Sequence, residues 1–440
     1  MHHALRLWPL FFCAASPLAA QTPPSQASVE ASPELQTRVR ELPGILSGTG
    51  SYETFFTPAF QTQVPKTTLD TIAAQLTVAF GPLQRVERIE VRDPFSAEVE
   101  IGYRDAVASL RIAVEPAAPH RVAGLLVAGT VARERTLADV ATTLAQLPGI
   151  SGFAWARLGS GAPQLLSTHR PDNPLAIGSA FKLIILDEIV RATNAGERNW
   201  DDMVTLDGSE LPGGGYNLKP KGSQISLREL ATQMISISDN SATDILLKTL
   251  GRAKVEAMLP VVGVADPARN RPFLSTMELF KLKGIEANDL PGRYLAADEA
   301  GRRSILDGEV ARLPALMIRP TLFRDGKPVR IDTLEWFLSP ADLVRVMDWL
   351  RRNTEGPKGA DARAVLSKNP GITPGAAGKW QWVGYKGGSE PGVMNMTLLL
   401  QAKAGDWYVL TAGWNDPAQA VSEARLASLI SRAAELAAER

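Results

Sequence analysis

The spacing of hydrophobic residues along the chain changes near residue 83. Before it, over residues 33–81, apolar side chains recur at helical spacing, as in Leu35, Val39 and Leu42, which predicts three helical pieces. After it, four stretches alternate apolar with polar positions and predict strands: VERIEV, AEVEIGY, ASLRIAVE and HRVAGLLVAG. Helices followed by antiparallel strands are typical of a small α+β domain, which we place at residues 33–133.

A second hydrophobic pattern begins at Leu137 and runs to the end of the chain. It opens with a short helix and two strands (GFAWARL and PQLLSTH), followed by an apolar helix over residues 179–192. Helices and loops then alternate until three late strands (WVGYKGG, MTLLLQAKA and WYVLTAGW) and a final Ala-rich helix from Pro417. Strands at both ends of residues 137–440 predict one antiparallel sheet, closed by the two ends of this domain and flanked by helices.

Length and charge fit two domains without a polyanionic partner. A chain of 440 residues is too long for one typical hydrophobic core, so two domains are expected. The 47 basic and 47 acidic residues give a formal net charge of zero, so nothing favours nucleic acid as a partner. We expect a small-molecule substrate instead, and the sequence leaves the oligomeric state open.

The first twenty residues have the pattern of a signal peptide. His2, His3 and Arg6 precede an apolar run over residues 7–15, and small residues at 19–20 offer a cleavage site before residue 21. The run is shorter than the ~20 apolar residues that span a bilayer, so we expect no stable membrane anchor. Residues 21–32 are polar with paired prolines and predict a flexible lead-in. The sequence therefore predicts a secreted or periplasmic protein.

Cysteine and histidine are scarce in the remaining chain. Cys13, the only cysteine, lies within the signal peptide, so the mature chain is expected to have no disulfide and no thiol nucleophile. His120 and His169 are the only histidines after residue 20. A structural zinc site has almost no ligands to draw on, and we expect neither a metal nor another cofactor.

Ser179 and Lys182 form the first motif that carries chemistry. They are three residues apart at the start of the apolar helix, so they share one helical face. A serine hydroxyl is a weak nucleophile until a base takes its proton. Burial disfavours the charged form of a lysine, so a lysine in an apolar setting can act as that base. The positive end of the helix dipole also favours the nascent anion.

Two further motifs follow in order. Ser238-Asp239-Asn240 begins 59 residues after Ser179; its serine can relay a proton, and Asn240 can hold both the lysine and a substrate carbonyl. Asp239 is expected to be a buried structural carboxylate. The third motif is Lys386-Gly387-Gly388-Ser389, whose glycines let a substrate backbone approach the strand closely. The amide groups of residues 179 and 389 are expected to form an oxyanion hole.

These motifs, in this order, resemble those of class A β-lactamases and penicillin-binding proteins. The resemblance includes the flanks ISLRELA and SATDILL of the second motif and covers residues 137–440. It implies an acyl-enzyme mechanism with Ser179 as the acylated nucleophile and Lys182 as proton acceptor. It further implies that Ser238 relays a proton, that Asn240 contacts the substrate and that Lys386 anchors a substrate carboxylate. Gly388 and Ser389 are implied to be substrate-binding positions.

The first domain also carries a resemblance, which rests on the order of its elements. Helices followed by a strand meander are similar to the cone-shaped NTF2-like folds, which can hold a small apolar ligand. A packing or dimerisation module is the alternative. The fusion of such a domain to a β-lactamase-like domain resembles the two-domain serine hydrolases of clavulanate-type biosynthetic clusters.

The chain departs from the family pattern in three places. Gly387 stands where the family has Thr or Ser, and the following strand MNMTLLLQAKAG holds no arginine, so two contacts to a substrate carboxylate are missing. Glu278 lies 38 residues after Asn240, about where the family's water-activating glutamate is expected, although a salt-bridged helix position is the alternative. The segment over residues 283–332 has no family counterpart and is either a lid over the site or a surface packed on the first domain.

Three functions are compatible with this pattern. The first is a β-lactamase that hydrolyses β-lactams through an acyl-enzyme. The second is an esterase or penicillin-binding-type acyl hydrolase with a non-lactam substrate. The third is a small-ligand-binding protein with a degenerate hydrolase domain. A Ser-His-Asp triad would need His169, and Ser179 lacks the Gly-x-Ser-x-Gly turn of such enzymes, so we expect His169 to be a surface residue.

Overall fold

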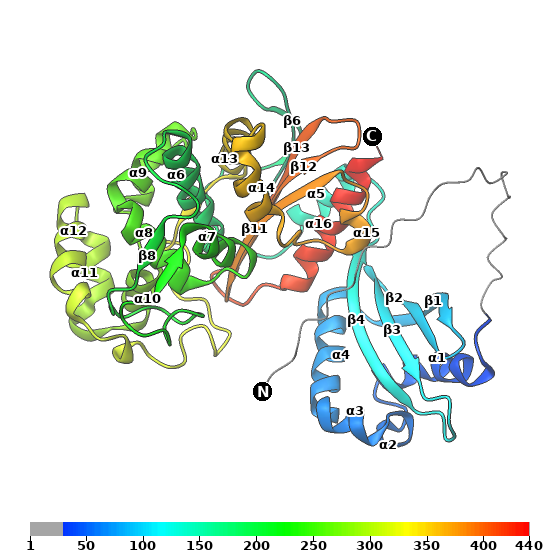
Figure 1. Cartoon of the computed structure of the whole chain (residues 1–440). Coiled ribbons are helices and arrows are strands. Elements are labelled where there is room, and N and C mark those ends of the chain that lie inside the picture. Colours follow the sequence, from blue (N-terminus) through cyan, green and yellow to red (C-terminus); the bar gives the residue numbers. More distant parts are fainter. Residues whose placement is uncertain (1–29, 440) are drawn as a thin grey trace, which may run out of the picture.

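The computed structural model describes residues 30–439 and shows a smaller N-terminal body beside a larger C-terminal one (Figure 1). The predicted signal peptide and most of the lead-in lie outside the described residues. Residues 30–132 form helices and then strands, as expected from the sequence. In order they are α1 (Pro33–Leu46), α2 (Tyr52–Phe55), α3 (Pro58–Gln63), α4 (Lys66–Phe80), β1 (Leu83–Asp93), β2 (Ser96–Tyr103), β3 (Ala106–Val114) and β4 (Val122–Ala132).

The N-terminal strands form an antiparallel sheet in the order β1-β2-β3-β4. Alternate side chains of β2, such as Val99 and Ile101, are buried against the helices, whereas most of β1 at the edge is exposed. Residues 33–80 hold four helices rather than the predicted three. The extra boundary arises because the Thr57 side chain caps α3 and Pro58 occupies its first turn.

A five-stranded antiparallel sheet forms the centre of the C-terminal body, in the order β11-β12-β13-β5-β6. Its strands are β5 (Ile150–Leu158), β6 (Gln164–His169), β11 (Trp382–Glu390), β12 (Val393–Gln401) and β13 (Trp407–Asn415). The predicted closure of one sheet by both ends of the domain is confirmed, because β13 pairs with β5. The α+β class is likewise confirmed.

The two faces of this sheet bury different cores. On β5, Phe153 and Trp155 face one way, toward α5 (Leu137–Ala145) and α16 (Glu423–Ala438). Ala154 and Ala156 face the other way and contact a helical region built around α6 (Lys182–Asn194). This helix is buried on nearly every side, so Lys182 at its start lies deep inside the domain, whereas Ser179 in the turn before it is half-buried.

The helical region holds most of the remaining elements. Its helices are α7 (Leu227–Ser236), α8 (Asn240–Leu250), α9 (Arg252–Val261), α10 (Thr276–Gly284), α11 (Leu290–Ala296), α12 (Glu299–Gly308), α13 (Pro340–Asn353) and α14 (Ala360–Ser367). The short α15 (Pro374–Ala377) packs on α16. Two strand pairs complete it: β7 (Leu175–Ala176) with β10 (Phe337–Leu338), and β8 (Met203–Thr205) with β9 (Gln224–Ser226).

The segment over residues 283–332 belongs to this helical region. Its helices α11 and α12 lie on the side of the domain away from the N-terminal sheet (Figure 1). Leu290, Tyr294 and Leu306 are buried in the same core as α6. Of the two interpretations offered by the sequence, packing on the N-terminal domain is therefore wrong for these helices.

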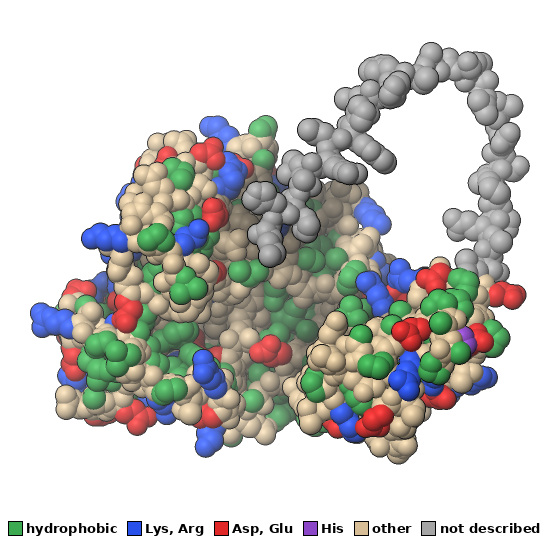
Figure 2. Space-filling view, turned by 60° about the horizontal axis from the view of Figure 1, so that its bottom comes forward, with side chains coloured by type: hydrophobic (Ala, Val, Ile, Leu, Met, Phe, Trp, Pro, Cys, Tyr) green, Lys and Arg blue, Asp and Glu red, His purple; other side chains and the backbone are tan. Residues whose placement is uncertain are grey.

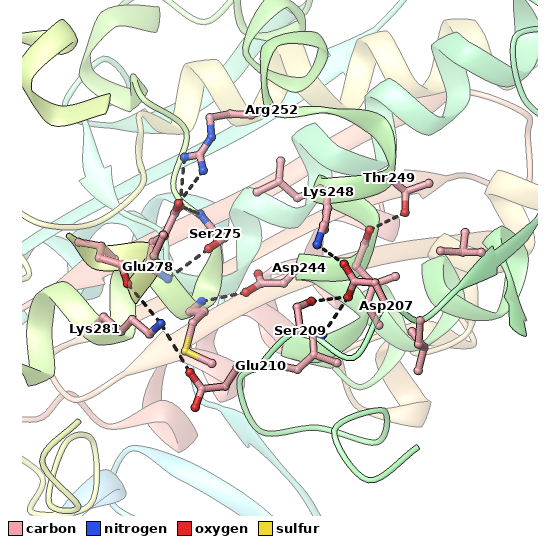
Figure 3. Close-up of a pocket in the computed structure, with 18 of the residues that line it drawn as sticks. Asp207, Ser209, Glu210, Asp244, Lys248, Thr249, Arg252, Ser275, Glu278 and Lys281 are labelled. Carbon is pink, nitrogen blue, oxygen red and sulfur yellow. Dashed lines mark hydrogen bonds and ion pairs between the residues drawn. The ribbon is translucent and has the colours of Figure 1, made fainter. Parts of the chain in front are cut away.

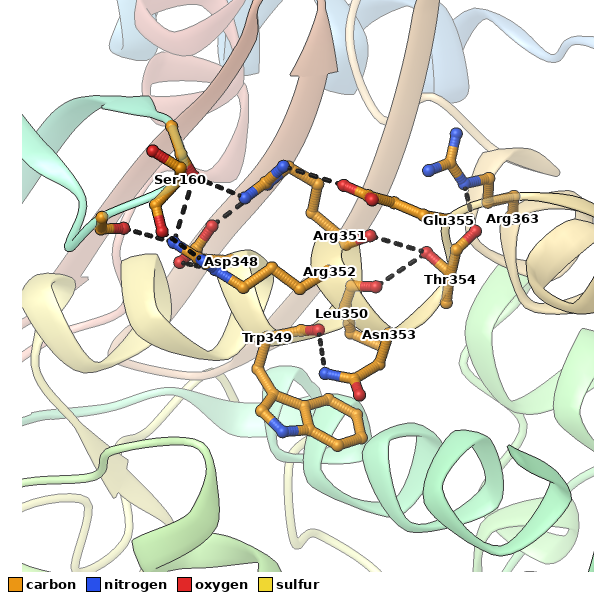
Figure 4. Close-up of polar contacts among 12 residues, drawn as sticks. Ser160, Asp348, Trp349, Leu350, Arg351, Arg352, Asn353, Thr354, Glu355 and Arg363 are labelled. Carbon is orange, nitrogen blue, oxygen red and sulfur yellow. Dashed lines mark hydrogen bonds and ion pairs between the residues drawn. The ribbon is translucent and has the colours of Figure 1, made fainter. Parts of the chain in front are cut away.

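Polar contacts fasten helix α13 to the sheet (Figure 4). Arg351 donates to the carbonyl of Gly159 at 2.7 Å, and Arg352 donates to the carbonyl of Ser160 at 2.8 Å, both in the β5–β6 turn. Asp348 accepts from both arginines at 3.1 and 2.8 Å. These bonds hold α13 against the β5–β6 turn.

The N-terminal body contacts the C-terminal one through β4, which packs on α16. The Arg432 side chain donates to the Glu134 carbonyl at 2.7 Å across this contact. On the face shown in Figure 2, basic and acidic side chains are interspersed over both bodies. Within residues 30–439, no helix combines the length and the apolar character that crossing a bilayer requires.

Candidate active site

Ser179 lies in a short 3-10 turn, η1 (Gly178–Phe181), that leads directly into α6. The turn is fixed by Phe181, whose ring stacks on Trp336 at 3.5 Å between centroids. Ser179 lines two adjoining cavities of about 450 and 430 Å³. We call the first the acidic cavity, because Glu335 and Glu390 line it, and the second the lysine cavity, because Lys386 lines it.

Lys182 is buried, and residues of the second motif accept all three hydrogen bonds of its ammonium group. Its Nζ donates to the Asn240 Oδ1 at 2.7 Å, to the Ser238 carbonyl at 2.7 Å and to the Ser238 Oγ at 3.1 Å. Burial lowers the pKa of Lys182 to about 7, and the charges of Asp244 and Asp239 oppose this shift only in part. Lys182 is thus able to exist as a neutral amine near neutral pH, as a base must.

Ser238 bridges the two lysines of the site. It adopts a left-handed backbone conformation, with φ at 59°, between α7 and α8. Its Oγ accepts from Lys182 and, at 3.0 Å, from Lys386. With both contacts made as an acceptor, the Ser238 hydroxyl hydrogen is free to point elsewhere. Burial and the charge of Lys182 hold the pKa of Lys386 well below its usual value.

Asp239 has the structural role expected for it. The carboxylate caps α8 by accepting from the Ala242 N–H at 2.8 Å, and it accepts from the Gly215 N–H at 2.6 Å. These bonds hold the turn that carries Ser238 and Asn240. The Lys182 contacts then join this turn to the first motif.

The third motif lies on β11, whose backbone packs directly against the turn of Ser179. A Cβ at Gly388 would lie 2.2 Å from the Ile177 carbonyl oxygen and 2.2 Å from the Ser179 nitrogen. Gly178 has φ at 48°, and its own Cβ would lie 3.1 Å from the Ser389 nitrogen. Only glycines allow the two backbones to approach this closely. The approach places the Ser179 and Ser389 amides beside one another.

Tyr385 explains why residue 387 is a glycine. The two residues share one face of β11, and a Cβ at Gly387 would lie 2.1 Å from the Tyr385 Oη. The tyrosine hydroxyl thus occupies the position that the Cβ of a Thr or Ser at residue 387 would take. Tyr385 also lines the lysine cavity. Burial and the charge of Glu423 raise the pKa of Tyr385 to about 12, so it remains a hydroxyl. No sequence motif marks Tyr385, although alternation along the strand offered a signal.

Glu278 is not brought to Ser179. It begins α10 in a capping box with Ser275 and forms two hydrogen bonds with Arg252, at 2.6 and 3.0 Å. It lines a different pocket, shown in Figure 3, together with Asp207 and Lys248. Glu278 therefore occupies the salt-bridged helix position that was the alternative to a water-activating base.

A buried cluster of one lysine and two glutamates borders the acidic cavity instead. Lys283 of α10 donates to the Glu335 carboxylate at 2.6 Å and to the Glu390 carboxylate at 2.5 Å. The side chains of Lys283, Glu335 and Glu390 are 0%, 1% and 9% exposed. No motif marked this cluster, although Glu390 directly follows the third motif in the sequence.

His169 does not line either cavity that contains Ser179. It ends β6, where it pairs with Phe153, and it is half-buried rather than at the surface as expected. Burial lowers its pKa. A Ser-His-Asp triad therefore has no histidine at Ser179. Within residues 30–439, no group of three His, Cys, Asp or Glu side chains is arranged to hold a metal ion.

Fold and site together define a serine acyl-hydrolase of the type shared by β-lactamases and penicillin-binding proteins. The chain belongs to the beta-lactamase enzyme family, whose model matches residues 133–439. The N-terminal strands lie before this match, so the NTF2-like resemblance of that body stays a prediction.

Three solved structures that are similar to this chain share little sequence with it. A beta-lactamase from Sphaerobacter thermophilus is 21% identical, with 69% of this chain and 95% of that chain covered and a TM-score of 0.47. A beta-lactamase from Chitinophaga pinensis is 17% identical, with coverage of 69% and 96% and a TM-score of 0.45. A protein named PBP-A is 18% identical, with coverage of 70% and 97% and a TM-score of 0.46. No curated protein sequence matches the chain.

Proposed function

We propose that this protein is an exported β-lactamase that opens β-lactam rings through an acyl-enzyme on Ser179. The observation that carries the proposal is the environment of Lys182. It is buried and bonded to Ser238 and Asn240, and its pKa of about 7 suits a base at neutral pH. A degenerate binding scaffold has no need of such a costly buried lysine, which disfavours the third function considered above.

Acylation follows from the positions of these groups. Lys182 takes the proton of the Ser179 hydroxyl as its Oγ bonds to the lactam carbonyl carbon. The amides of residues 179 and 389 stabilise the negative oxygen that forms. The ring carbon–nitrogen bond then breaks, and the nitrogen takes the hydroxyl proton of Ser238, which lies at hydrogen-bond distance from Lys182. The Lys182 proton passes to Ser238, so the lysine is neutral again and Ser179 is esterified.

The lysine cavity suits the carboxylate that β-lactams carry next to the ring. Lys386, Ser238 and Tyr385 all line it. A bound carboxylate would favour the charged form of Lys386, which burial otherwise opposes. Tyr385 would supply a hydroxyl donor in place of the one that Gly387 lacks.

An esterase or penicillin-binding-type acyl hydrolase is the second candidate. Gly387 and the lack of arginine in β12 favour it, because both remove contacts to a substrate carboxylate. A chromogenic cephalosporin and a short-chain aryl ester, each assayed with wild type and Ser179→Ala, separate the two. The β-lactamase proposal expects cephalosporin turnover that Ser179→Ala abolishes. Ester turnover alone would leave the second candidate.

Export rests on the sequence pattern of residues 1–20. N-terminal sequencing of the protein recovered from the periplasm or medium of an expressing bacterium tests it. We expect the mature chain to begin at or near Gln21. Recovery of the uncleaved chain in the cytoplasm would contradict export.

A further inference from the structure

An acyl-enzyme needs a base that activates water, and Glu278 is committed elsewhere. Both Glu278 oxygens accept from Arg252, and one also accepts from the Ser275 N–H at 2.8 Å. The acidic cavity beside Ser179 contains other carboxylates, those of Glu335, Glu390 and Glu423. The first two are buried and share Lys283, whereas Glu423 is exposed at the start of α16.

Glu335 and Glu390 differ in how many of their carboxylate oxygens already accept a hydrogen bond from an N–H group. Glu335 accepts from Lys283 through Oε1 and from the Trp336 N–H through Oε2, at 2.6 and 3.2 Å. Glu390 accepts from Lys283 through Oε1 at 2.5 Å. Among the described residues no N–H group donates to its Oε2, and the only other close polar group is the Glu335 carboxyl, which lies at hydrogen-bond distance from the Glu390 carboxyl. This oxygen is therefore the one able to bind a water in the cavity.

The surroundings of Glu390 favour holding and releasing a proton. Three aromatic residues, Phe280, Phe323 and Trp336, line the same cavity as Glu390. Burial and the charge of Glu335 raise the pKa of Glu390 well above its usual value, while Lys283 opposes the shift. Burial alone would lower the pKa of Lys283, but the charges of both glutamates outweigh it, so Lys283 remains a cation. A cluster of one cation and two carboxyl groups has zero net charge only when one carboxyl group holds its proton.

We propose that Glu390 is the catalytic base of deacylation, held in place by Lys283 and Glu335. Ser389, which precedes it on β11, shares the acidic cavity with Glu390 and Ser179, so the base lies on the strand that also borders the reacting carbonyl. This inference rests on the proposed acyl-enzyme function and adds the residue that completes the cycle.

The step balances with one water and no other reagent. The step starts from the ionised form of Glu390: the water oxygen bonds to the acyl carbonyl carbon, and its proton passes to the Glu390 carboxylate. The bond between that carbon and the Ser179 Oγ then breaks. The proton held by Glu390 returns to Ser179, so the product acid leaves and both side chains regain their starting state.

Glu390→Gln is the direct test, with Glu278→Gln as a matched control of the same chemistry outside the cavity. A glutamine at 390 resembles the protonated carboxyl and leaves Lys283 paired with Glu335, so the fold is expected to persist. Each variant is mixed with benzylpenicillin and, separately, with p-nitrophenyl acetate, and the adduct on Ser179 is followed by intact-mass spectrometry. We expect Glu390→Gln to acylate like wild type but to deacylate ~10²–10⁴-fold more slowly. Glu278→Gln should release both acyl groups at the wild-type rate.

A structural role is separated from a catalytic one by two further measurements. Glu390→Asp keeps a carboxylate and should deacylate faster than Glu390→Gln. Circular dichroism checks that the two variants are folded to the same extent. Wild-type deacylation should rise with pH as Glu390 ionises, in the field of Lys283, Glu335 and Glu423, and Glu390→Gln should lose this dependence.

The outcomes separate this inference from the proposed function. Deacylation of Glu390→Gln at the wild-type rate, equal rates for the Asp and Gln variants, or a larger loss in Glu335→Gln would each overturn the role of Glu390. If benzylpenicillin leaves wild type unmodified while the ester acylates it, the β-lactamase proposal fails and the ester still tests Glu390. If neither reagent acylates wild type, both proposals fail.

Discussion

Substitution of Gly388 by alanine should disable acylation while sparing most of the fold. The new Cβ would lie 2.2 Å from the Ile177 oxygen and the Ser179 nitrogen, where ordinary contact begins at 3.4 Å, a shortfall of about 1.2 Å. Both atoms belong to the backbone, so the methyl group can be accommodated only if β11 and the turn of Ser179 separate. That separation removes the Ser389 amide from the reacting carbonyl.

The expected loss follows from the cost of misplacing one oxyanion donor. Such a loss lowers the rate by ~10²–10³-fold, or about 3–4 kcal/mol of transition-state stabilisation. The assay is kcat/KM for a chromogenic cephalosporin, with the thermal unfolding midpoint measured on the same preparation. Gly213→Ala is the control, because its Cβ would meet nothing within 4 Å. Wild-type activity in a folded Gly388→Ala variant would refute the role assigned to the close approach of the two backbones.

Three other predictions concern single side chains. The acylation rate should rise with pH and level off above pH 8, because Lys182 with a pKa near 7 is about half neutral at pH 7 and about nine-tenths neutral at pH 8; pre-steady-state rates that are flat or fall over this range would contradict it. Tyr385→Phe should raise KM for penicillins about tenfold, the scale of one hydrogen bond to a charged group, and leave KM for an uncharged aryl ester unchanged; equal effects on both would contradict a carboxylate contact. Glu278→Gln should lower the free energy of unfolding by roughly 1–3 kcal/mol, because Arg252 loses its charged partner, and it should not slow turnover. Slower turnover together with an unchanged free energy of unfolding in urea would instead indicate a catalytic role for Glu278.

The sequence was most informative where chemistry depends on local spacing. Ser179 and Lys182 share one turn of chain, and the strand patterns at both ends of the domain predicted the closed sheet correctly. The order of the three motifs also identified Ser238 and Lys386, which the structure joins through one hydroxyl. Each of these inferences used residues close in sequence or a fixed motif.

The parts that sequence could not supply depend on contacts between distant segments. Lys283 and Glu390 are 107 residues apart, and only the folded helical region brings them to one cavity. Glu278 lies at a suggestive distance from Asn240, yet Arg252 of α9 draws it into another pocket. Tyr385 was overlooked because its effect on residue 387 arises from side-chain packing rather than from a motif.

The most direct test of acylation at Ser179 is intact-mass spectrometry of the wild-type protein at successive times after mixing with benzylpenicillin. We expect an adduct of one penicillin mass that peptide mapping assigns to Ser179, that decays as penicilloic acid forms, and that Ser179→Ala never shows. Penicillin turnover with no adduct on Ser179, or an identical adduct in Ser179→Ala, would contradict the central claim that Ser179 is the acylated nucleophile.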